Sequence, residues 1–393
     1  MMERSKYMSI PKVRFHGFKE KWREESLSKL FVERHEISTI TESLPQLSFT
    51  ISEGVIYPND RKSNKRDFLI KDITNKKYLV TYVGDIIYNP ANVIYGAIHR
   101  NSLCNGVVSP IYKIFKTEQD SNFMECVVRN PSFISQLSMK TEGTVTKLKT
   151  LKPESFLEMI VKIAPSIDEQ QKIASYFQSL DSLIQTTSKK LASLNLIKAA
   201  SLQSMFPQEG ETVPKVRFKG FKGEWDNDFI SNVCKITTGK SNTQDQVKNG
   251  LYPFFIRSEN IARSNKYLYD CEAVITIGDG NIGRVFHYIN GKFDLHQRCY
   301  MMRNFRNVSA LYFYYYFSAF FYDRAIKMSA KATVDSVRLN MIADMNILYP
   351  KNKLEQQKIA SYFCNLDKQI SLQTQRLEKL KQIKAACLDK MFV

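Results

Sequence analysis

Two glycine-containing stretches have the spacing of phosphate-binding loops. Gly278–Gly283 reads GDGNIG, the spacing of a dinucleotide fingerprint, and Thr237–Ser241 reads TTGKS, the end of a P-loop. A dinucleotide fingerprint must open a helix, but GDGNIG precedes RVFHYI, then Asn290-Gly291, then KFDLHQRCYMM, which predict two strands around a hairpin turn. Cys234 stands where a P-loop needs its first glycine. We therefore predict that GDGNIG is a tight loop at a sheet edge, where a ligand can approach closely.

The other candidates for chemistry are also incomplete. Tyr88–Asn92 reads YNPAN and lacks the second proline and the aromatic residue of the Asn-Pro-Pro-aromatic loop with which adenine methyltransferases hold their target. The five histidines are dispersed, and the seven cysteines contain no C-x-x-C pair, which argues against a zinc site and a disulfide framework. The sequence therefore predicts a chain that is not an enzyme, has no metal site and binds no cofactor of its own.

Two motifs occur twice in the chain. EQQKIASYF occupies Glu169–Phe177 and again Glu355–Phe363, and PKVRFHGFKEKW at Pro11–Trp22 returns as PKVRFKGFKGEW at Pro214–Trp225. The segments between these motifs have diverged and differ in length. The chain is therefore a tandem duplication, in which a shared frame surrounds a variable insert in each half.

The repeated block predicts a long helix in each half. Ser166 and Asn352 lie three residues before Glu169 and Glu355, which is capping-box spacing. Apolar residues then recur at alternating steps of four and three, as in a helical heptad seam. Because the two seams are related, we expect the helices to pack against each other as an antiparallel pair. The seam residues are Ile173, Phe177, Leu180, Ile184, Leu191, Leu194 and Met205, and Ile359, Phe363, Leu366, Ile370, Leu377, Leu380 and Met391.

Three polar residues in each nonapeptide lie off the seam, and packing alone does not require their identity. Because the inserts have diverged while these positions are unchanged, we infer a binding surface for two copies of one partner. The alternative is a recent duplication without selection. The residues are Gln171, Lys172 and Ser175, with their copies Gln357, Lys358 and Ser361.

Composition favours a globular nucleic-acid-binding protein. The 393 residues carry 57 Lys and Arg against 39 Asp and Glu, a net charge of +18, which points to a polyanionic partner. The length predicts two domains. The start lacks the apolar stretch of a signal peptide, and the apolar run at Ala310–Tyr322 is too short to cross a bilayer. We therefore expect a cytoplasmic protein without membrane association, in which this run is a buried helix.

The inserts predict α+β domains, with β-type runs early and helices late in each. Their loops carry side chains that reach base edges and phosphates, although each one has the alternative reading of a solvated surface residue. The DNA-contact candidates are Lys62, Lys65, Arg66, Asn89, Asn92, His99, Lys140, Thr144 and Lys147 in the first insert, and Arg257, Asn281, Arg284, His296, Arg298, Lys331, Thr333 and Arg338 in the second.

Over nearly its full length the chain resembles the specificity subunits of Type I restriction-modification systems. The order frame, insert, helix, frame, insert, helix is similar to that family, as are the PKVRFxGFKxxW and EQQKIASYFxxLD motifs. The segments GDIIYNPA and GDGNIG look like its recognition loops. The resemblance implies an α+β fold with two pseudo-two-fold-related target recognition domains, separated by a pair of long antiparallel coiled-coil helices. The expected segments are 11–163 and 214–348 for the domains, 164–206 and 349–393 for the helices, and 207–213 for a linker.

The resemblance also implies a function in DNA recognition. Each domain would read one half of a bipartite sequence in double-stranded DNA, and the helices would set the gap and dock two methyltransferase subunits. S-adenosylmethionine would be bound by those subunits, and ATP and Mg would be bound by restriction subunits. Two alternatives from other classes are a freestanding DNA adenine methyltransferase and a coiled-coil scaffold without sequence preference.

Overall fold

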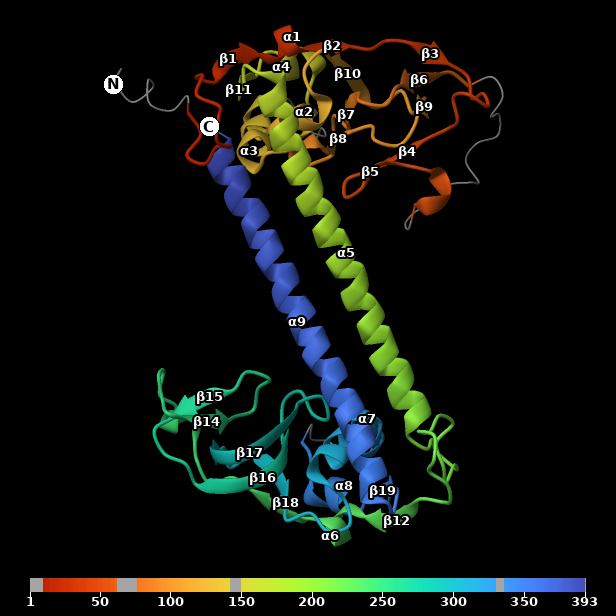
Figure 1. Cartoon of the computed structure of the whole chain (residues 1–393), viewed down its shortest axis with the longest axis vertical. Helices are drawn as coiled ribbons and strands as arrows, with labels where there is room; N and C mark the ends of the chain where they lie inside the picture. Colours follow the sequence, from red (N-terminus) through yellow and green to blue (C-terminus); the bar gives the residue numbers. More distant parts are fainter. Residues whose placement is uncertain (1–9, 62–75, 142–149, 330–335, 393) are drawn as a thin grey trace. The chain divides into compact units, whose positions relative to one another are not determined.

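The computed structural model describes residues 10–61, 76–141, 150–329 and 336–392. The chain forms two compact units: unit 1 comprises residues up to 187 and from 376 onward, and unit 2 comprises residues 188–375. Each unit holds one domain and a part of both long helices, α5 (Ile167–Met205) and α9 (Lys353–Met391) (Figure 1).

In unit 1, an antiparallel pair of frame strands encloses the insert. β1 (Arg23–Ser26) pairs with β11 (Ile160–Ile163), which leads into α5. Between them lie a four-stranded sheet of order β2-β10-β7-β8, a three-stranded sheet β3-β6-β9 and the pair β4-β5. The bounds are α1 Leu27–Leu30, β2 Phe31–Glu33, β3 Ile37–Ser38, β4 Ser48–Thr50, β5 Gly54–Ile56, η1 Pro58–Asp60, β6 Tyr78–Thr81, β7 Ile86–Tyr88, η3 Val93–Tyr95, β8 Ile98–Arg100, β9 Gly106–Val108, β10 Lys113–Thr117, α2 Ser121–Val128, α3 Pro131–Lys140 and α4 Pro153–Leu157.

Unit 2 repeats this plan. β12 (Asp226–Phe229) pairs with β19 (Asn346–Tyr349), which leads into α9, and the insert contains a six-stranded sheet of order β13-β18-β16-β17-β14-β15. The bounds are α6 Ile230–Val233, β13 Lys235–Thr238, η4 Thr243–Asp245, β14 Tyr252–Phe255, β15 Ala262–Ser264, β16 Tyr269–Ile277, β17 Phe286–Leu295, β18 Cys299–Arg303, α7 Ala310–Ser329 and α8 Leu339–Ala343.

The two inserts share a common core. The strand order β2-β10-β7-β8 of unit 1 has its counterpart in β13-β18-β16-β17 of unit 2, and a short helix, α1 or α6, follows the first frame strand in each. Helices follow the sheet in both: α2 and α3 in unit 1, and α7 in unit 2. The predicted α+β class is therefore confirmed, and α7 is the buried helix expected from its apolar run. None of the helices in the described ranges is long and apolar enough to span a membrane.

Within each unit, α5 and α9 run antiparallel. In unit 1, Phe177 of α5 lies 5.9 Å from Phe392, just beyond the end of α9, and Tyr176 contacts Cys387. In unit 2, Phe206, which directly follows α5, stacks on Phe363 of α9 with ring centroids 5.6 Å apart. Phe206 and Phe392 are equivalent in the repeat, as are Phe177 and Phe363. In both units, therefore, the phenylalanine of the nonapeptide packs against the phenylalanine that follows the other long helix. The predicted antiparallel pairing of the two related seams is confirmed.

One prediction about the second insert was wrong. Asn290-Gly291 forms no hairpin turn, because β17 continues through both residues, which pair with Glu272 and Cys271 of β16. The turn lies instead at residues 278–285, which connect β16 and β17. β16 is nine residues long, and pairing along its whole length outweighs the local turn preference of Asn-Gly.

Candidate functional site

In unit 1 the two repeated motifs meet at a buried ion pair. Arg14 of the PKVRF motif donates from Nε and Nη2 to the two oxygens of Glu169, at 2.6 and 2.7 Å. Trp22 of the same motif donates from Nε1 to Glu169 Oε1 at 3.3 Å. The Glu169 side chain is only 1% exposed, so this bidentate pair fixes the start of α5 to the N-terminal frame.

Unit 2 has the equivalent pair. Arg217 donates from Nε and Nη2 to Glu355 at 2.6 and 2.8 Å, and also to the backbone oxygens of Gly223 and Lys222. Glu169 and Glu355 were expected to close capping boxes, but their carboxylates bind arginine instead. The Asn352 side chain does accept a hydrogen bond from Leu354 N at 2.9 Å.

The first glutamine of each nonapeptide is buried and ties α5 or α9 to its insert. Gln170 donates to Ala164 O and accepts from Asp120 N, the residue that caps α2. Gln356 donates to Pro350 O and accepts from Ser309 N, directly before α7. These glutamines therefore set the start of the insert helices relative to the repeated helices.

The other polar residues of the nonapeptide face solvent in both units. Gln171, Lys172 and Ser175 are exposed, and so are Gln357, Lys358 and Ser361; these six residues form the twin surface. In unit 2 the last three, with Phe218, Phe221 and Tyr362, line a groove of about 420 Å³. Lys358 Nζ lies 5.1 Å from the ring of Phe221, and Lys172 Nζ lies 5.8 Å from that of Phe15. The twin surface therefore offers one cation beside aromatic residues in each unit.

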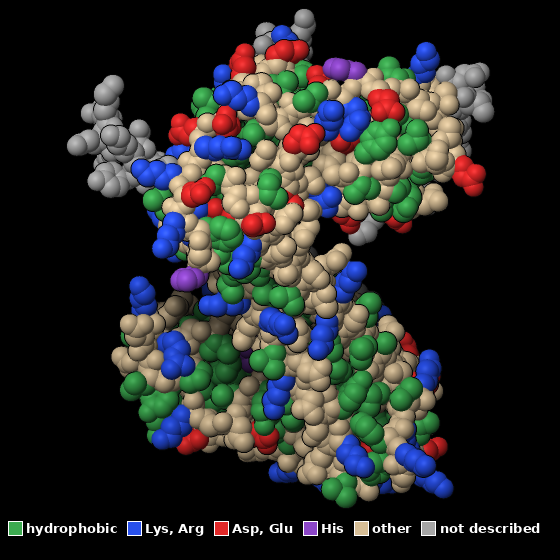
Figure 2. All heavy atoms as spheres, turned by 45° about the horizontal axis from the view of Figure 1, so that its top comes forward, with side chains coloured by type: hydrophobic (Ala, Val, Ile, Leu, Met, Phe, Trp, Pro, Cys, Tyr) green, Lys and Arg blue, Asp and Glu red, His purple; other side chains and the backbone are tan. Residues whose placement is uncertain are grey.

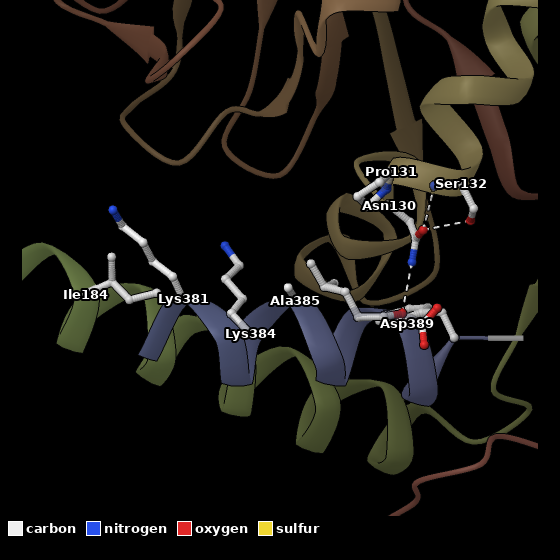
Figure 3. A pocket seen from close by; sticks show the side chains of 10 residues that line it. Asn130, Pro131, Ser132, Ile184, Lys381, Lys384, Ala385 and Asp389 are labelled. Carbon is white, nitrogen blue, oxygen red and sulfur yellow. Dashed lines mark hydrogen bonds between the residues drawn. The ribbon is translucent and has the colours of Figure 1, made fainter. Parts of the chain in front are cut away.

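Unit 1 also has a hollow of about 330 Å³ between the start of α3 and the last turns of α9 (Figure 3). Lys381 and Lys384 extend from α9 along it, and Asn130 donates to Leu388 O at 3.2 Å. The Asn130 side chain also caps α3 by accepting from Ser132 N. The hydrogen bond from Asn130 fixes the start of α3 to α9. The residues that line this hollow include none of the site residues predicted from the sequence.

The DNA-contact candidates of the first insert are scattered. Asn89 accepts from Ala91 N at 3.0 Å and stabilises the turn that holds Asn92, so YNPAN is a structural turn. Lys140 ends α3 and is exposed. His99 is only 4% exposed, and its Nε2 forms a hydrogen bond with Ile51 O, so its contact with DNA stays a prediction that its burial does not favour. The other five candidates lie outside the described residues: Lys62, Lys65, Arg66, Thr144 and Lys147.

In the second insert, the structure brings three candidates together around Asp279. Arg257 Nη1 and Arg298 Nη1 both donate to Asp279 Oδ2, at 3.1 and 2.8 Å. Burial raises the pKa of Asp279, but the hydrogen bonds from Arg298 and Arg257 outweigh it, so the pKa lies below its ordinary value and the carboxylate is charged. His296 lies next to this group and accepts from Arg298 N through Nδ1.

His296 itself is largely buried. It is 4% exposed, and burial together with the charge of Arg257 lowers its pKa, so the ring is neutral at pH 7. Since Nδ1 accepts, the proton lies on Nε2, which is 3.4 Å from Thr243 Oγ1. In this structure His296 therefore supports the loop that carries Arg298, and its direct contact with DNA stays a prediction that its burial does not favour.

The remaining candidates of the second insert are dispersed. Arg284 stacks on Tyr322 of α7, with its guanidinium carbon 4.3 Å from the ring centre. Asn281 and Arg338 are exposed, and Lys331 and Thr333 lie outside the described residues. Figure 2 shows basic side chains spread over the visible face of unit 2, with few acidic ones between them.

Sequence reasoning did not single out three acidic residues that organise these sites. Asp279 lies within GDGNIG, but the prediction for this loop rests on its glycines, on Asn281 and on Arg284, which directly follows it. Glu169 and Glu355 were assigned to capping, although Arg14 and Arg217 recur at equivalent places in the other repeated motif. That double recurrence of opposite charges was the available signal. Within the described ranges, His, Cys, Asp and Glu side chains form no cluster that could hold a metal ion.

Comparisons with known proteins agree with these features. Residues 222–382 match the family described as the Type I restriction modification DNA specificity domain. The Type I restriction enzyme EcoDI specificity subunit of Escherichia coli is 26% identical over 160 residues, which are 41% of this chain. The match spans about a third, 35%, of that relative's length.

One solved structure shows the same fold, and a second one aligns less well. The S subunit of a Type-I restriction-modification system from M. genitalium aligns with a TM-score of 0.68 at 13% identity, over 98% of this chain and 99% of that one. The HsdS subunit from Thermoanaerobacter tengcongensis aligns with a TM-score of 0.43 at 15% identity, over 96% and 98%. The family match and the curated relative agree with the resemblance seen in the sequence, so this chain is similar to the specificity subunits of Type I restriction-modification systems. The first structure shows that the fold is shared.

Proposed function

We propose that this chain is the sequence-specific DNA-binding subunit of a Type I restriction-modification complex. The observation that carries the proposal is the match of residues 222–382 to a DNA specificity domain. The net charge of +18 supports a polyanionic partner. Each Lys or Arg that neutralises a DNA phosphate releases counterions and so raises the affinity for DNA.

Each insert reads one half of a bipartite target in double-stranded DNA. The shared strand order of the two inserts supports this division, because the same core carries different loops in each unit. Different loops on one scaffold give two different half-sites. The helices α5 and α9 set the unspecified gap between the half-sites.

The twin surface docks two methyltransferase subunits, one on each copy. Its residues are exposed in both units, whereas the glutamate and the first glutamine of each nonapeptide are buried. The chain directs adenine-N6 methylation and restriction without catalysing either. S-adenosylmethionine binds to the methyltransferase subunits, and ATP and Mg bind to restriction subunits.

An insert exchange tests the proposal. Residues 30–149 are replaced by the corresponding insert of a relative with a different target, and the bound and methylated sequences are mapped for the assembled complex. We expect one half-site to change and the other to stay, because each insert reads its own half-site independently of the other. An unchanged target, or binding that is indifferent to sequence, would contradict the proposal and favour a scaffold.

A second assay addresses catalysis. The purified chain alone is incubated with labelled S-adenosylmethionine and mixed-sequence DNA, and then again with its methyltransferase subunits. We expect label in DNA only in the second reaction. Label transfer by the chain alone would instead indicate a freestanding methyltransferase.

A further inference from the structure

Three side chains from separate segments of the second insert form a compact polar cluster, the arginine clamp: Arg257, Asp279 and Arg298. Arg257 follows β14, Asp279 lies in the β16–β17 loop and Arg298 lies between β17 and β18. Both guanidinium groups share the single oxygen Asp279 Oδ2. Asp279 is 19% exposed, whereas Arg257 and Arg298 are 45% and 62% exposed. The carboxylate is therefore mostly buried, and the two arginine side chains that bind it are exposed to solvent.

Most donors of the clamp are free. A guanidinium has five N–H donors. Within the described part of the chain, each arginine side chain uses Nη1 on Asp279 and has no other acceptor. Nε and Nη2 of each group are left for a ligand that accepts two parallel hydrogen bonds.

The backbone holds the clamp in place. Gly278 N donates to Arg298 O at 2.8 Å, and Val337 N donates to Gly278 O at 2.7 Å. A Cβ atom at Gly278 would lie 2.6 Å from Arg298 O, so only glycine permits this approach. Asp279, Arg298 and Gln297 border a hollow of about 230 Å³. The donors of Arg298 are thus presented beside a space rather than on a flexible loop tip.

We propose that Arg298 reads a guanine in the half-site of the second insert, through bidentate hydrogen bonds to its O6 and N7, and that Asp279 is the residue that positions it. This inference rests on the proposed function in DNA recognition. Guanine O6 and N7 take two parallel donors, which a fixed arginine supplies.

A phosphate contact is the competing interpretation, and the geometry disfavours it. A phosphate is attracted by any nearby cation, and a fixed orientation adds little specificity. In the clamp, the negative Asp279 cancels one of two positive charges, which weakens attraction to phosphate. The same carboxylate fixes the direction of Arg298, which is what base readout requires.

The test compares DNA preferences of full-length variants. The chain, assembled with its methyltransferase subunits, selects from a DNA pool in which the second half-site is randomised. Arg298→Ala should lose its preference for guanine at one position by about tenfold or more, with the other positions unchanged. Asp279→Ala should loosen the same position. Lys327→Ala on the exposed side of α7 removes an equal charge outside the clamp and should leave the selected sequence unchanged.

The outcomes separate the interpretations. Equal weakening on all sequences by Arg298→Ala, with a salt dependence lower by about one phosphate, would overturn base readout in favour of a phosphate contact. If Asp279→Ala has no effect on the selected sequence, the positioning role of Asp279 is overturned. If the alanine variant does not fold, Asp279→Asn, which keeps the shape of the side chain, is tested in its place. A wild-type chain without any preferred sequence would refute the proposed function itself, whereas a preferred bipartite target unchanged by Arg298→Ala would refute only this inference.

Discussion

Units 1 and 2 hold the same buried carboxylate in two different ways. In unit 1, Glu169 binds Arg14 and also accepts from the indole of Trp22. In unit 2, Glu355 binds Arg217, and within the described residues the indole nitrogen of Trp225 is buried without a partner. Arg217 instead gains two backbone acceptors. The duplication has thus kept the charge pair and the outward Gln, Lys and Ser, while their surroundings have drifted.

The largest effect is expected from breaking the equivalence of the twin surface. Lys172→Glu should leave one methyltransferase subunit per chain, and Lys172→Glu with Lys358→Glu should leave none, since reversal of a buried interface charge weakens each site about 30-fold or more. The stoichiometry is measured by native mass spectrometry or light scattering. Lys190→Glu, an equal reversal on an exposed part of α5 outside the nonapeptide, is the control. Two subunits bound to the double variant would contradict the proposed docking role.

Loss of the buried carboxylate should destabilise each unit separately. Glu169→Ala or Glu355→Ala leaves a largely buried arginine without its carboxylate, which costs about 3–5 kcal/mol. Hydrogen exchange should show lost protection in unit 1 for the first variant and in unit 2 for the second. Arg14→Met combined with Glu169→Leu should be milder than Glu169→Ala, because no charge remains buried. Equal loss of protection in both units would show that they unfold together.

The two tryptophans differ in their hydrogen bonds to the buried glutamate. Trp22→Phe removes a hydrogen bond to Glu169, whereas Trp225→Phe removes a buried donor that has no acceptor among the described residues. Both variants lose similar ring volume, so the first should be about 1 kcal/mol more destabilising than the second. Denaturant midpoints with matched slopes measure the difference. Equal values would mean that the 3.3 Å contact contributes nothing.

The smallest effect concerns two equivalent ion pairs between α5 and α9. Lys198 pairs with Asp367 in unit 2, and Lys384 pairs with Asp181 in unit 1. These groups are partly exposed, so Asp367→Ala and Asp181→Ala should each cost about 0.2–1 kcal/mol, and less at high salt. Unfolding in low and high salt tests this. A cost above that range, or one that salt does not reduce, would indicate a larger role in helix pairing.

Sequence reasoning was most successful where a pattern repeats. The heptad seams predicted two long helices, and the relation between the seams predicted their antiparallel pairing, because two apolar stripes of the same period can pack against each other. The apolar run at Ala310–Tyr322 predicted the buried helix α7, because it is too short to cross a bilayer. The α+β class followed from the β-type runs and the later helices of each insert. The family resemblance followed from the order of the repeated motifs.

Other features could be decided only in three dimensions. Asn290-Gly291 has strong turn preference, but the long partner strand β16 keeps it in a ladder. His99 and His296 have side chains suited to DNA, yet the fold buries both. The DNA-contact residues and the domain boundaries predicted from the sequence remain predictions.

The sequence by itself determined the duplication and the two paired helices, because repeats and apolar periodicity can be read directly from the order of residues. Its net charge predicted a polyanionic partner. Only the tertiary structure decided which of the repeated polar residues face inward and which arginines share Asp279. The reason is that burial and charge pairing depend on groups far apart in the chain, such as Arg14 and Glu169 or Arg257 and Asp279.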